Sequence, residues 1–285
     1  MSNTVVRTNV MAMNSHRNLG LVSNQQSRAS QRLSSGFRIN SAADDAAGLA
    51  ISEGMRAQIR GMNQASRNAQ DGISLIQTAE GYMQTITELA QRARELMVQG
   101  ANDTYNDTQR GHIRNEIDQL AAEISRIWDD ATFNGNEVFG DDMLGGSTFM
   151  LQVGADEGMS INVIDEMSMT ATSMASSLSS ATGHMTGIGA TYSAFSSAIG
   201  QIDSFLDDIN EFRAGLGAIQ NRLEFTIQNL DIASENLSAS ESRIRDADMA
   251  MEMMRLTQAN ILQQAATSML AQANQAPQSI LQLLG

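Results

Sequence analysis

The sequence predicts a mainly α protein: a long antiparallel coiled-coil rod that carries a small β-hairpin and whose two termini pair into a terminal helical domain. In the stretch 198–237, apolar residues recur at alternating spacings of four and three, the heptad pattern of a helix packed lengthwise on partners. Aromatic residues make up only 4% of the 285 residues, and the single proline is Pro277, so long helices are favoured over one thick core. Both terminal arms are amphipathic but too weakly apolar to be stable alone.

The heptad stretch has one apolar face and one charged face. Its repeat fails only once, at Thr226, and its phase continues, with more polar residues, through Met251 and Ile261. A strict seven-residue repeat predicts a left-handed supercoil. The apolar positions are Ala198, Ile202, Phe205, Ile209, Phe212, Leu216, Ile219, Leu223, Leu230, Ala233 and Leu237.

The N-terminal arm, residues 1–35, reads as a weakly amphipathic helix that stops at Gly36. Ser41 followed by Asp44 resembles a capping box at the start of the next helix. The adjacent carboxylates Asp44 and Asp45 raise the alternative of a metal or acid–base site. Neighbouring positions on a helix do not face each other, and acids are favourable in a first turn. The structural interpretation is therefore preferred.

The middle of the chain predicts helices over 62–99 and 109–128, separated by the turn-rich segment 100–108. Two short strands are expected at 148–153 and 159–164, joined as a hairpin. The expected division begins with an N-terminal arm at 1–41 and a rod domain at 42–165 with its hairpin near 148–164. A short Ser/Thr-rich connection at 166–197, the returning helix of the rod domain at 198–243 and a C-terminal arm at 244–285 follow.

The C-terminal arm carries no charged side chain after Arg255 yet keeps an apolar stripe. A neutral amphipathic helix suits burial among similar helices, where an unpaired charge would be costly. Asn and Gln interleave with the stripe, which disfavours a membrane span. We expect a polymerisation seam formed by Leu262, Ala266, Met269, Ala273, Ile280 and Leu283.

Composition narrows the functional classes. All 18 basic residues are Arg, the net charge is −14, and cysteine is absent, so disulfides and thiolate chemistry are excluded. Residues 1–67 carry 8 Arg against 3 acids, but no nucleic-acid-binding motif accompanies them. Complementation of the acidic C-terminal half is the preferred interpretation. No signal peptide is recognised, so an extracellular location would require export without a cleaved signal.

Several long motifs, in the same order at both ends, resemble the bacterial flagellins, the subunits of the flagellar filament. The resemblance covers nearly the whole chain except 166–197, where most flagellins carry large variable domains, so the chain looks like a minimal form. The motifs are Arg32-Leu33-Ser34-Ser35-Gly36, Asp44-Asp45-Ala46-Ala47-Gly48, Asn68-Ala69-Gln70-Asp71-Gly72-Ile73-Ser74, Leu216-Gly217-Ala218-Ile219-Gln220-Asn221-Arg222-Leu223, Ser240-Glu241-Ser242-Arg243-Ile244, Asp246-Ala247-Asp248-Met249-Ala250 and Ala273-Asn274-Gln275.

The resemblance implies a subunit that polymerises with itself into an extracellular helical filament used for motility. It implies that the arms 1–41 and 244–285 form an inner coiled-coil domain, and that 42–165 and 198–243 form an outer rod domain. It also implies export in an unfolded state by the flagellar type III route, and as partners an export chaperone, the cap and the hook-associated proteins. No cofactor, metal, nucleic acid or membrane partner is expected.

The segment 91–99 resembles the part of flagellin that the Toll-like flagellin receptor of animals reads. By that resemblance Arg92, Leu96 and, from the next helix, Glu116 would be the main contacts. The alternative is that Arg92 and Glu116 only form solvated or inter-subunit ion pairs.

Three other functions fit the sequence less well than a filament subunit does. An enzyme is disfavoured because His16, His112 and His184 lie far apart and no metal or nucleophile motif occurs. A hook-associated junction protein of the flagellar axial structure is the closer alternative, and self-polymerisation would separate it from a filament subunit. A soluble coiled-coil adaptor would form a small closed oligomer.

Overall fold

The computed structural model describes residues 8–139, 150–162, 176–177, 179–180, 183 and 191–284, with side chains described as far as residue 275. The chain divides into two compact units: unit 1 comprises Met1–Ala57 with Asn236–Gly285, and unit 2 comprises Gln58–Glu235. Within the described ranges, no helix is long and apolar enough to cross a membrane. The mainly α fold class predicted from the sequence is confirmed.

The described helices are α1 (Val10–Ser35), α2 (Ala46–Gly100), α3 (Asp107–Asp130), α5 (Tyr192–Arg245) and α6 (Met249–Leu284). Four short strands accompany them: β1 (Thr132–Phe133), β2 (Asn136–Glu137), β3 (Met150–Gln152) and β4 (Ser160–Asn162). The helix expected from residue 62 therefore starts earlier, at Ala46, and the helix expected from residue 198 starts at Tyr192. Apart from the described residues 176–177, 179–180, 183 and 191–197, the connection 166–197 lies outside the described residues.

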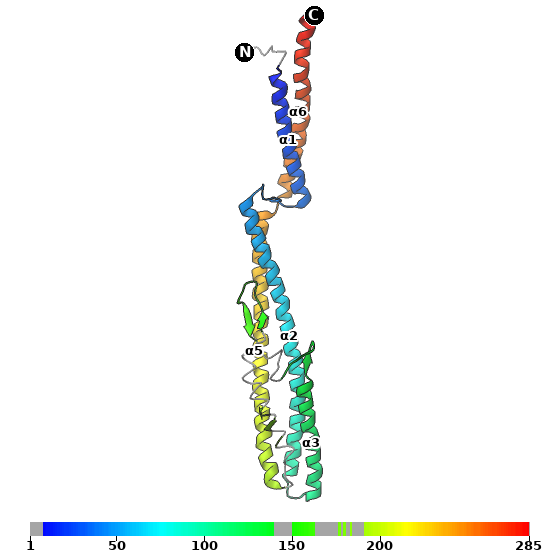
Figure 1. Cartoon of the computed structure of the whole chain (residues 1–285), viewed down its shortest axis with the longest axis vertical. Coiled ribbons are helices and arrows are strands. Elements are labelled where there is room, and N and C mark those ends of the chain that lie inside the picture. Colours follow the sequence, from blue (N-terminus) through cyan, green and yellow to red (C-terminus); the bar gives the residue numbers. More distant parts are fainter. Residues whose placement is uncertain are drawn as a thin grey trace. The chain divides into compact units, whose positions relative to one another are not determined.

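The core of unit 2 lies between α2, α3 and α5, which run side by side in Figure 1. From Ala198 to Leu223, every predicted seam position of α5 is buried, and further along the seam Leu230, Ala233 and Leu237 are half-buried. The facing stripe of α2 includes Ile76, Met83 and Ile86, and α3 contributes Ile113, Ile117 and Ile124. The heptad therefore packs inside the subunit, as the sequence predicted.

An aromatic cluster closes this core beside the end of α3. The ring of Phe139 stacks on Trp128 with centroids 4.8 Å apart, and it meets the edges of Phe212 at 6.0 Å and Tyr82 at 6.3 Å. Offset and edge-to-face pairs of this kind add about 0.5–1.5 kcal/mol beyond the area they bury. The scarce aromatic residues are thus concentrated where three helices and a turn meet.

Two antiparallel hairpins belong to unit 2. In the predicted one, Met150 pairs with Asn162, Leu151 with Ile161 and Gln152 with Ser160. Residues 148–149 and 163–164 of the predicted strands lie outside the described residues. The other hairpin pairs β1 with β2 through a two-residue turn at Asn134 and Gly135, both of which have positive φ.

In unit 1, α1 and α6 lie side by side and antiparallel (Figure 1). Asn9 Nδ2 donates to the carbonyl of Ala273 at 2.6 Å, and Gln26 Nε2 donates to Asn260 Oδ1 at 2.8 Å. Both helices turn a heptad-spaced face toward each other. These faces are Ala12, Ser15, Leu19, Val22, Gln26, Ala29 and Leu33 on α1, and Glu252, Leu256, Ala259, Gln263, Ala266, Leu270 and Ala273 on α6.

Capping residues explain where the helices of unit 1 end. Gly36, at φ 75°, ends α1, as expected. Asp45 Oδ1 accepts the N–H of Gly48, whereas Asp44 Oδ2 accepts the Ser41 hydroxyl and backbone N–H groups of the loop before α2. Desolvation raises the pKa of Asp44, but the hydrogen bonds from the Ser41 hydroxyl and from the backbone outweigh it, so the pKa of Asp44 is lowered. Asp45 thus caps α2 and Asp44 holds the loop before it, in agreement with the structural interpretation of both carboxylates. The capping box expected at Ser41 is corrected, because α2 begins only at Ala46, after Asp45.

The helical phase that continues past residue 243 in the sequence is interrupted in the structure. Helix α5 ends at Arg245, and Asp248 caps the new helix α6 by accepting the N–H groups of Ala250 and Met251. The N–H of Arg38 donates to the carbonyl of Arg245 across this break at 2.6 Å. The division of the chain at 41/42 and 243/244 stays a prediction beside the compact units that divide at 57/58 and 235/236.

Candidate assembly and recognition surfaces

Helix α6 has a second face, which unit 1 leaves exposed. Met251, Met254, Ile261, Leu262 and Met269 are all large, apolar and exposed, and none belongs to the α1-facing stripe. Helical spacing places Met254 and Ile261 opposite that stripe and the other three on its flank, where Leu262 also borders the pocket between α1 and α6. We call this set the outer face of α6. Exposed apolar surface of this extent on one helix is typical of an interaction site.

The predicted polymerisation seam is divided between the two faces of α6. Ala266 is half-buried and Ala273 buried on the stripe toward α1, whereas Leu262 and Met269 are exposed on the outer face. The side chains of Ile280 and Leu283 lie outside the described residues. The seam as a polymerisation surface stays a prediction, and the structure assigns its large described members to the exposed side.

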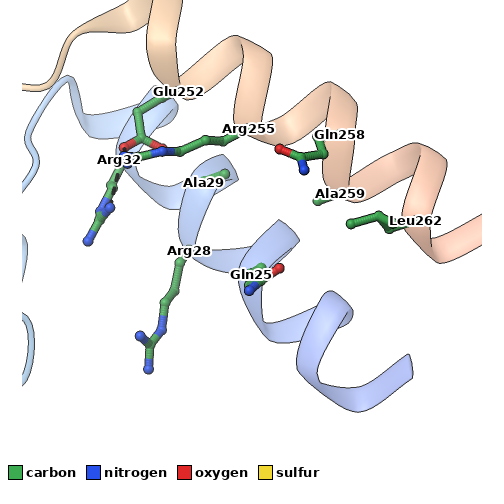
Figure 2. A pocket seen from close by; sticks show the side chains of 9 residues that line it. All are labelled: Gln25, Arg28, Ala29, Arg32, Glu252, Arg255, Gln258, Ala259 and Leu262. Atoms are coloured by element: carbon green, nitrogen blue, oxygen red, sulfur yellow. Dashed lines mark hydrogen bonds and ion pairs between the residues drawn. The ribbon is translucent and has the colours of Figure 1, made fainter. Parts of the chain in front are cut away.

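An ion cluster links α1 to α6 near the start of α6. The Glu252 carboxylate is buried, with Arg32 Nη1 3.3 Å and Arg255 Nη1 2.7 Å from its Oε1. Figure 2 shows Arg32 and Arg255 converging on this carboxylate while Arg28 extends away from α6. These four charged residues line a pocket of about 380 Å³, with Ala29, Ala259 and Leu262 among the other lining residues.

The chemistry of the Glu252 cluster (Arg32, Glu252 and Arg255) is structural. A buried carboxylate requires charged partners, and here both arginines supply them. Between Thr8 and Ser35, and between Met249 and Gly285, Glu252 is the only acidic residue. A buried charge with its partners at one level of a weakly apolar helix pair favours one register over its neighbours.

The predicted receptor residues lie in unit 2. Arg92 Nη2 is 3.0 Å from Glu116 Oε1 on α3, and Arg92 Nη1 is 3.1 Å from Glu95 Oε2 one turn along α2. The hydrogen bond to Glu116, and then the one to Glu95, raise the pKa of the Arg92 guanidinium. About half of each side chain in the Arg92–Glu116 pair is exposed. The structure thus brings these two predicted residues together on one surface.

Leu96, the third predicted receptor residue, does not share that surface. Its exposed fraction is 2%, and it belongs to the hydrophobic core of unit 2. It lies next to Met97 and one turn from Ala93, both buried positions of the helical stripe. Leu96 therefore supports the helix under Arg92 rather than extending outward beside it.

Other charged residues hold unit 2 together. Arg94 pairs with Asp203 at 2.5 Å, and Arg213 pairs with Glu80 at 3.3 Å, so α2 and α5 are joined at two levels. Arg110 is buried at the start of α3, where its guanidinium donates to the carbonyls of Gly100 and Asn102. Arg110 thereby fixes the turn from α2 to α3.

Sequence reasoning missed the Glu252 cluster, and it divided the outer face of α6 between two patterns, with Leu262 and Met269 in the predicted polymerisation seam. The signal for Glu252 was present, since a lone carboxylate in a neutral arm is unusual. The outer face was partly visible as the continuing phase of Met251 and Ile261, which was read as part of the packed seam. Within the described part of the chain, no group of His, Asp or Glu side chains is arranged to hold a metal ion.

Comparison with known proteins is consistent along the chain. The model of the bacterial flagellin N-terminal helical region matches residues 6–142, and that of the C-terminal helical region matches residues 199–284. The flagellin of Halalkalibacterium halodurans is 51% identical over 98% of this chain and 99% of its own length. The flagellar filament 31.3 kDa core protein of Treponema maltophilum is 46% identical and the flagellin of Bacillus subtilis 42% identical, each over 98% of this chain and 99% of the relative.

These matches run through both ends of the chain and cover nearly the full length of each of these relatives. The chain is a structural subunit of a flagellar filament, and it is a subunit of minimal form; it is not an enzyme. The hook-associated alternative is not favoured. The chain belongs to the bacterial flagellin family.

Proposed function

We propose that this flagellin polymerises through the outer face of α6, with the α1–α6 pair as the inner domain of each subunit. The observation that carries the proposal is the row of large apolar side chains that unit 1 leaves exposed on α6. Full burial of a Leu, Ile or Met side chain contributes roughly 1.5–3 kcal/mol. Covering such a row by a second copy of the chain therefore supplies a substantial driving force.

The charge of this region supports the same proposal. After Arg255 the helix has no charged side chain, so neighbouring subunits can pack closely without desolvating an ion. Ile280 and Leu283 continue the predicted seam along the sequence and are proposed to take part. Ala266 and Ala273 contribute indirectly, because they hold α6 against α1.

Seeded polymerisation of the full chain tests the proposal. Leu262→Glu places a charge on the outer face and should abolish growth on seeds while the monomer keeps its helical content. Gln264→Glu is the matched control, because Gln264 is exposed on a polar flank of α6. Growth of the Leu262→Glu variant at the wild-type rate would exclude the outer face as a subunit contact.

We further propose export by the flagellar type III route, with an export chaperone, the cap and the hook-associated proteins as partners. The resemblance of both ends of the chain to flagellin supports this proposal. Release of the chain into the medium should then stop in cells whose flagellar export gate is deleted. Continued release at the normal level would count against this route.

A second proposal is that the monomer is recognised by the Toll-like flagellin receptor through Arg92 and Glu116. Both side chains are half exposed and joined by an ion pair, so they offer a fixed, charged surface. Leu96 would act by packing under this surface. Arg126 on α3 has a similar environment and serves as a control: it is an exposed arginine that pairs with two carboxylates, those of Glu123 and Asp130.

Receptor activation by purified monomer tests this second proposal. Arg92→Asp should abolish signalling, whereas Arg126→Asp should leave it intact, although both changes break an exposed ion pair. Circular dichroism establishes that both variants remain folded. Equal loss of signalling in the two variants would attribute the effect to charge in general and remove Arg92 from the role.

A further inference from the structure

Methionines are concentrated at the start of α6. Met249, Met251, Met253 and Met254 lie within six consecutive residues, and Met269 follows two turns beyond Leu262. All five are exposed, with exposed fractions between 45% for Met251 and 66% for Met254. The sulfur atoms of this helix are therefore open to solvent in the free subunit.

Two of these side chains help to form an apolar groove. Met253 and Met254, together with Ile261 and Leu262, line a shallow surface groove of about 480 Å³, completed by Thr257 and Gln258. The groove overlaps the outer face of α6. Met253 and Met254 thus stand where a second copy of the chain would have to pack.

Exposed methionine can be modified in a way that leucine cannot. Hydrogen peroxide transfers one oxygen atom to the thioether sulfur: the O–O bond breaks, an S=O bond forms, the sulfur is oxidised by two electrons and the peroxide is reduced to water. The product is a polar sulfoxide that accepts hydrogen bonds. Burial of such a group without a partner is unfavourable, and each buried sulfoxide should weaken a packed contact by about tenfold or more.

We propose that Met253 and Met254 are a redox-sensitive modification site that controls assembly. Peroxide oxidises these two residues in the free subunit, and the sulfoxides prevent a second copy of the chain from packing on the outer face of α6. In the filament the same sulfur atoms are covered and protected. This proposal rests on the proposed function, because it requires the outer face to be the subunit contact.

The chain contains internal controls for this chemistry. Met83 and Met97 are buried in the core of unit 2 and should resist peroxide. Met150 and Met159, on the hairpin of unit 2, are exposed to 55% and 54%, which is comparable to Met253 at 52%. The hairpin methionines should be oxidised as readily as those of α6, yet their oxidation should not affect assembly.

The experiment uses the full chain as monomer, treated with hydrogen peroxide, mapped by mass spectrometry and then supplied with seeds. Oxidation at Met253 and Met254 should raise the critical concentration for growth by about tenfold or more. Reduction with methionine sulfoxide reductases for both epimers should restore it. Unchanged growth of monomer that is fully oxidised at both positions would overturn the proposal.

Variants locate the effect. Met251→Leu/Met253→Leu/Met254→Leu/Met269→Leu removes every methionine of the groove and of the outer face, largely preserves side-chain volume, and should keep growing after peroxide treatment. Met150→Leu/Met159→Leu should be inhibited like the wild type. Loss of growth in the first variant after peroxide, to the same extent as in the wild type, would overturn the proposal. A measurement without variants accompanies these: Met253 and Met254 should oxidise about tenfold more slowly in filaments than in monomer, and equal rates would overturn it.

Leu262→Glu separates this inference from the function on which it rests. If Leu262→Glu blocks growth but the oxidised wild type grows, the outer face is the contact and only the redox inference fails. If Leu262→Glu also grows, the proposed contact itself is wrong.

Discussion

The aromatic cluster of unit 2 offers a direct test of the packing. Phe212 is 1% exposed on α5 and meets the ring of Phe139 with centroids 6.0 Å apart. Phe212→Ala removes a whole ring from a closed site, so it should cost about 3–5 kcal/mol. Phe225 lies on the same helix but is 65% exposed, so Phe225→Ala should change the stability by no more than about 0.5 kcal/mol.

Tryptophan fluorescence during urea unfolding provides the assay. The chain has one tryptophan, Trp128, and it stacks on Phe139, so its signal reports unit 2 and not the terminal arms. The midpoint should fall strongly for Phe212→Ala and stay near the wild-type value for Phe225→Ala. Similar midpoints for the two variants would refute the assignment of α5's inward face.

Two further predictions concern ion pairs. The hydrogen bond from Arg126 lowers the pKa of Glu123 in the folded protein. The pair therefore stabilises the fold above the carboxyl's unfolded pKa of about 4.3, and this stabilisation is lost as the pH falls through the lower folded pKa. Glu123→Gln removes the titrating carboxyl, so acid should lower the urea midpoint less in this variant than in the wild type. In the Glu252 cluster, Arg32→Ala should lower the melting temperature of filaments more than Arg255→Ala, because only Arg32 joins α1 to α6; the reverse order, measured by light scattering, would contradict this.

Much of unit 2 could be predicted because the apolar residues of its helices recur at nearly regular spacing. The seam of α5 places Ile202, Phe205 and Ile209 at positions that the structure buries, and a regular apolar repeat has only one way to be buried. The hairpin was equally readable from its strand and turn composition. The sequence did not show that Leu96 is buried in the core, because a motif resemblance does not state which side of a helix faces the core.

Unit 1 was harder to predict because its packed face is chemically mixed. On α6 the stripe toward α1 contains Gln263 and Glu252, whereas the exposed side contains Leu262 and Met269. Hydrophobicity alone therefore selects exposed positions of α6 beside the stripe that packs on α1, and the predicted seam combined exposed positions with stripe positions. A chain that is completed by other copies of itself exposes apolar residues that a monomeric protein would bury.

The charge distribution gives this arrangement a physical rationale. Residues 58–235 carry 25 acids against 9 Arg, a balance of −16, whereas the residues of unit 1 carry 7 acids against 9 Arg, a balance of +2. A strongly negative unit 2 keeps free subunits soluble through mutual repulsion, which falls off within a Debye length of about 8–10 Å. A nearly neutral α6 lets apolar surfaces approach without that repulsion. The net negative charge thus lies on unit 2, and the proposed subunit contact lies on the nearly neutral α6. Glu252, the one carboxylate within α6, is tolerated there because Arg32 and Arg255 neutralise it inside the subunit.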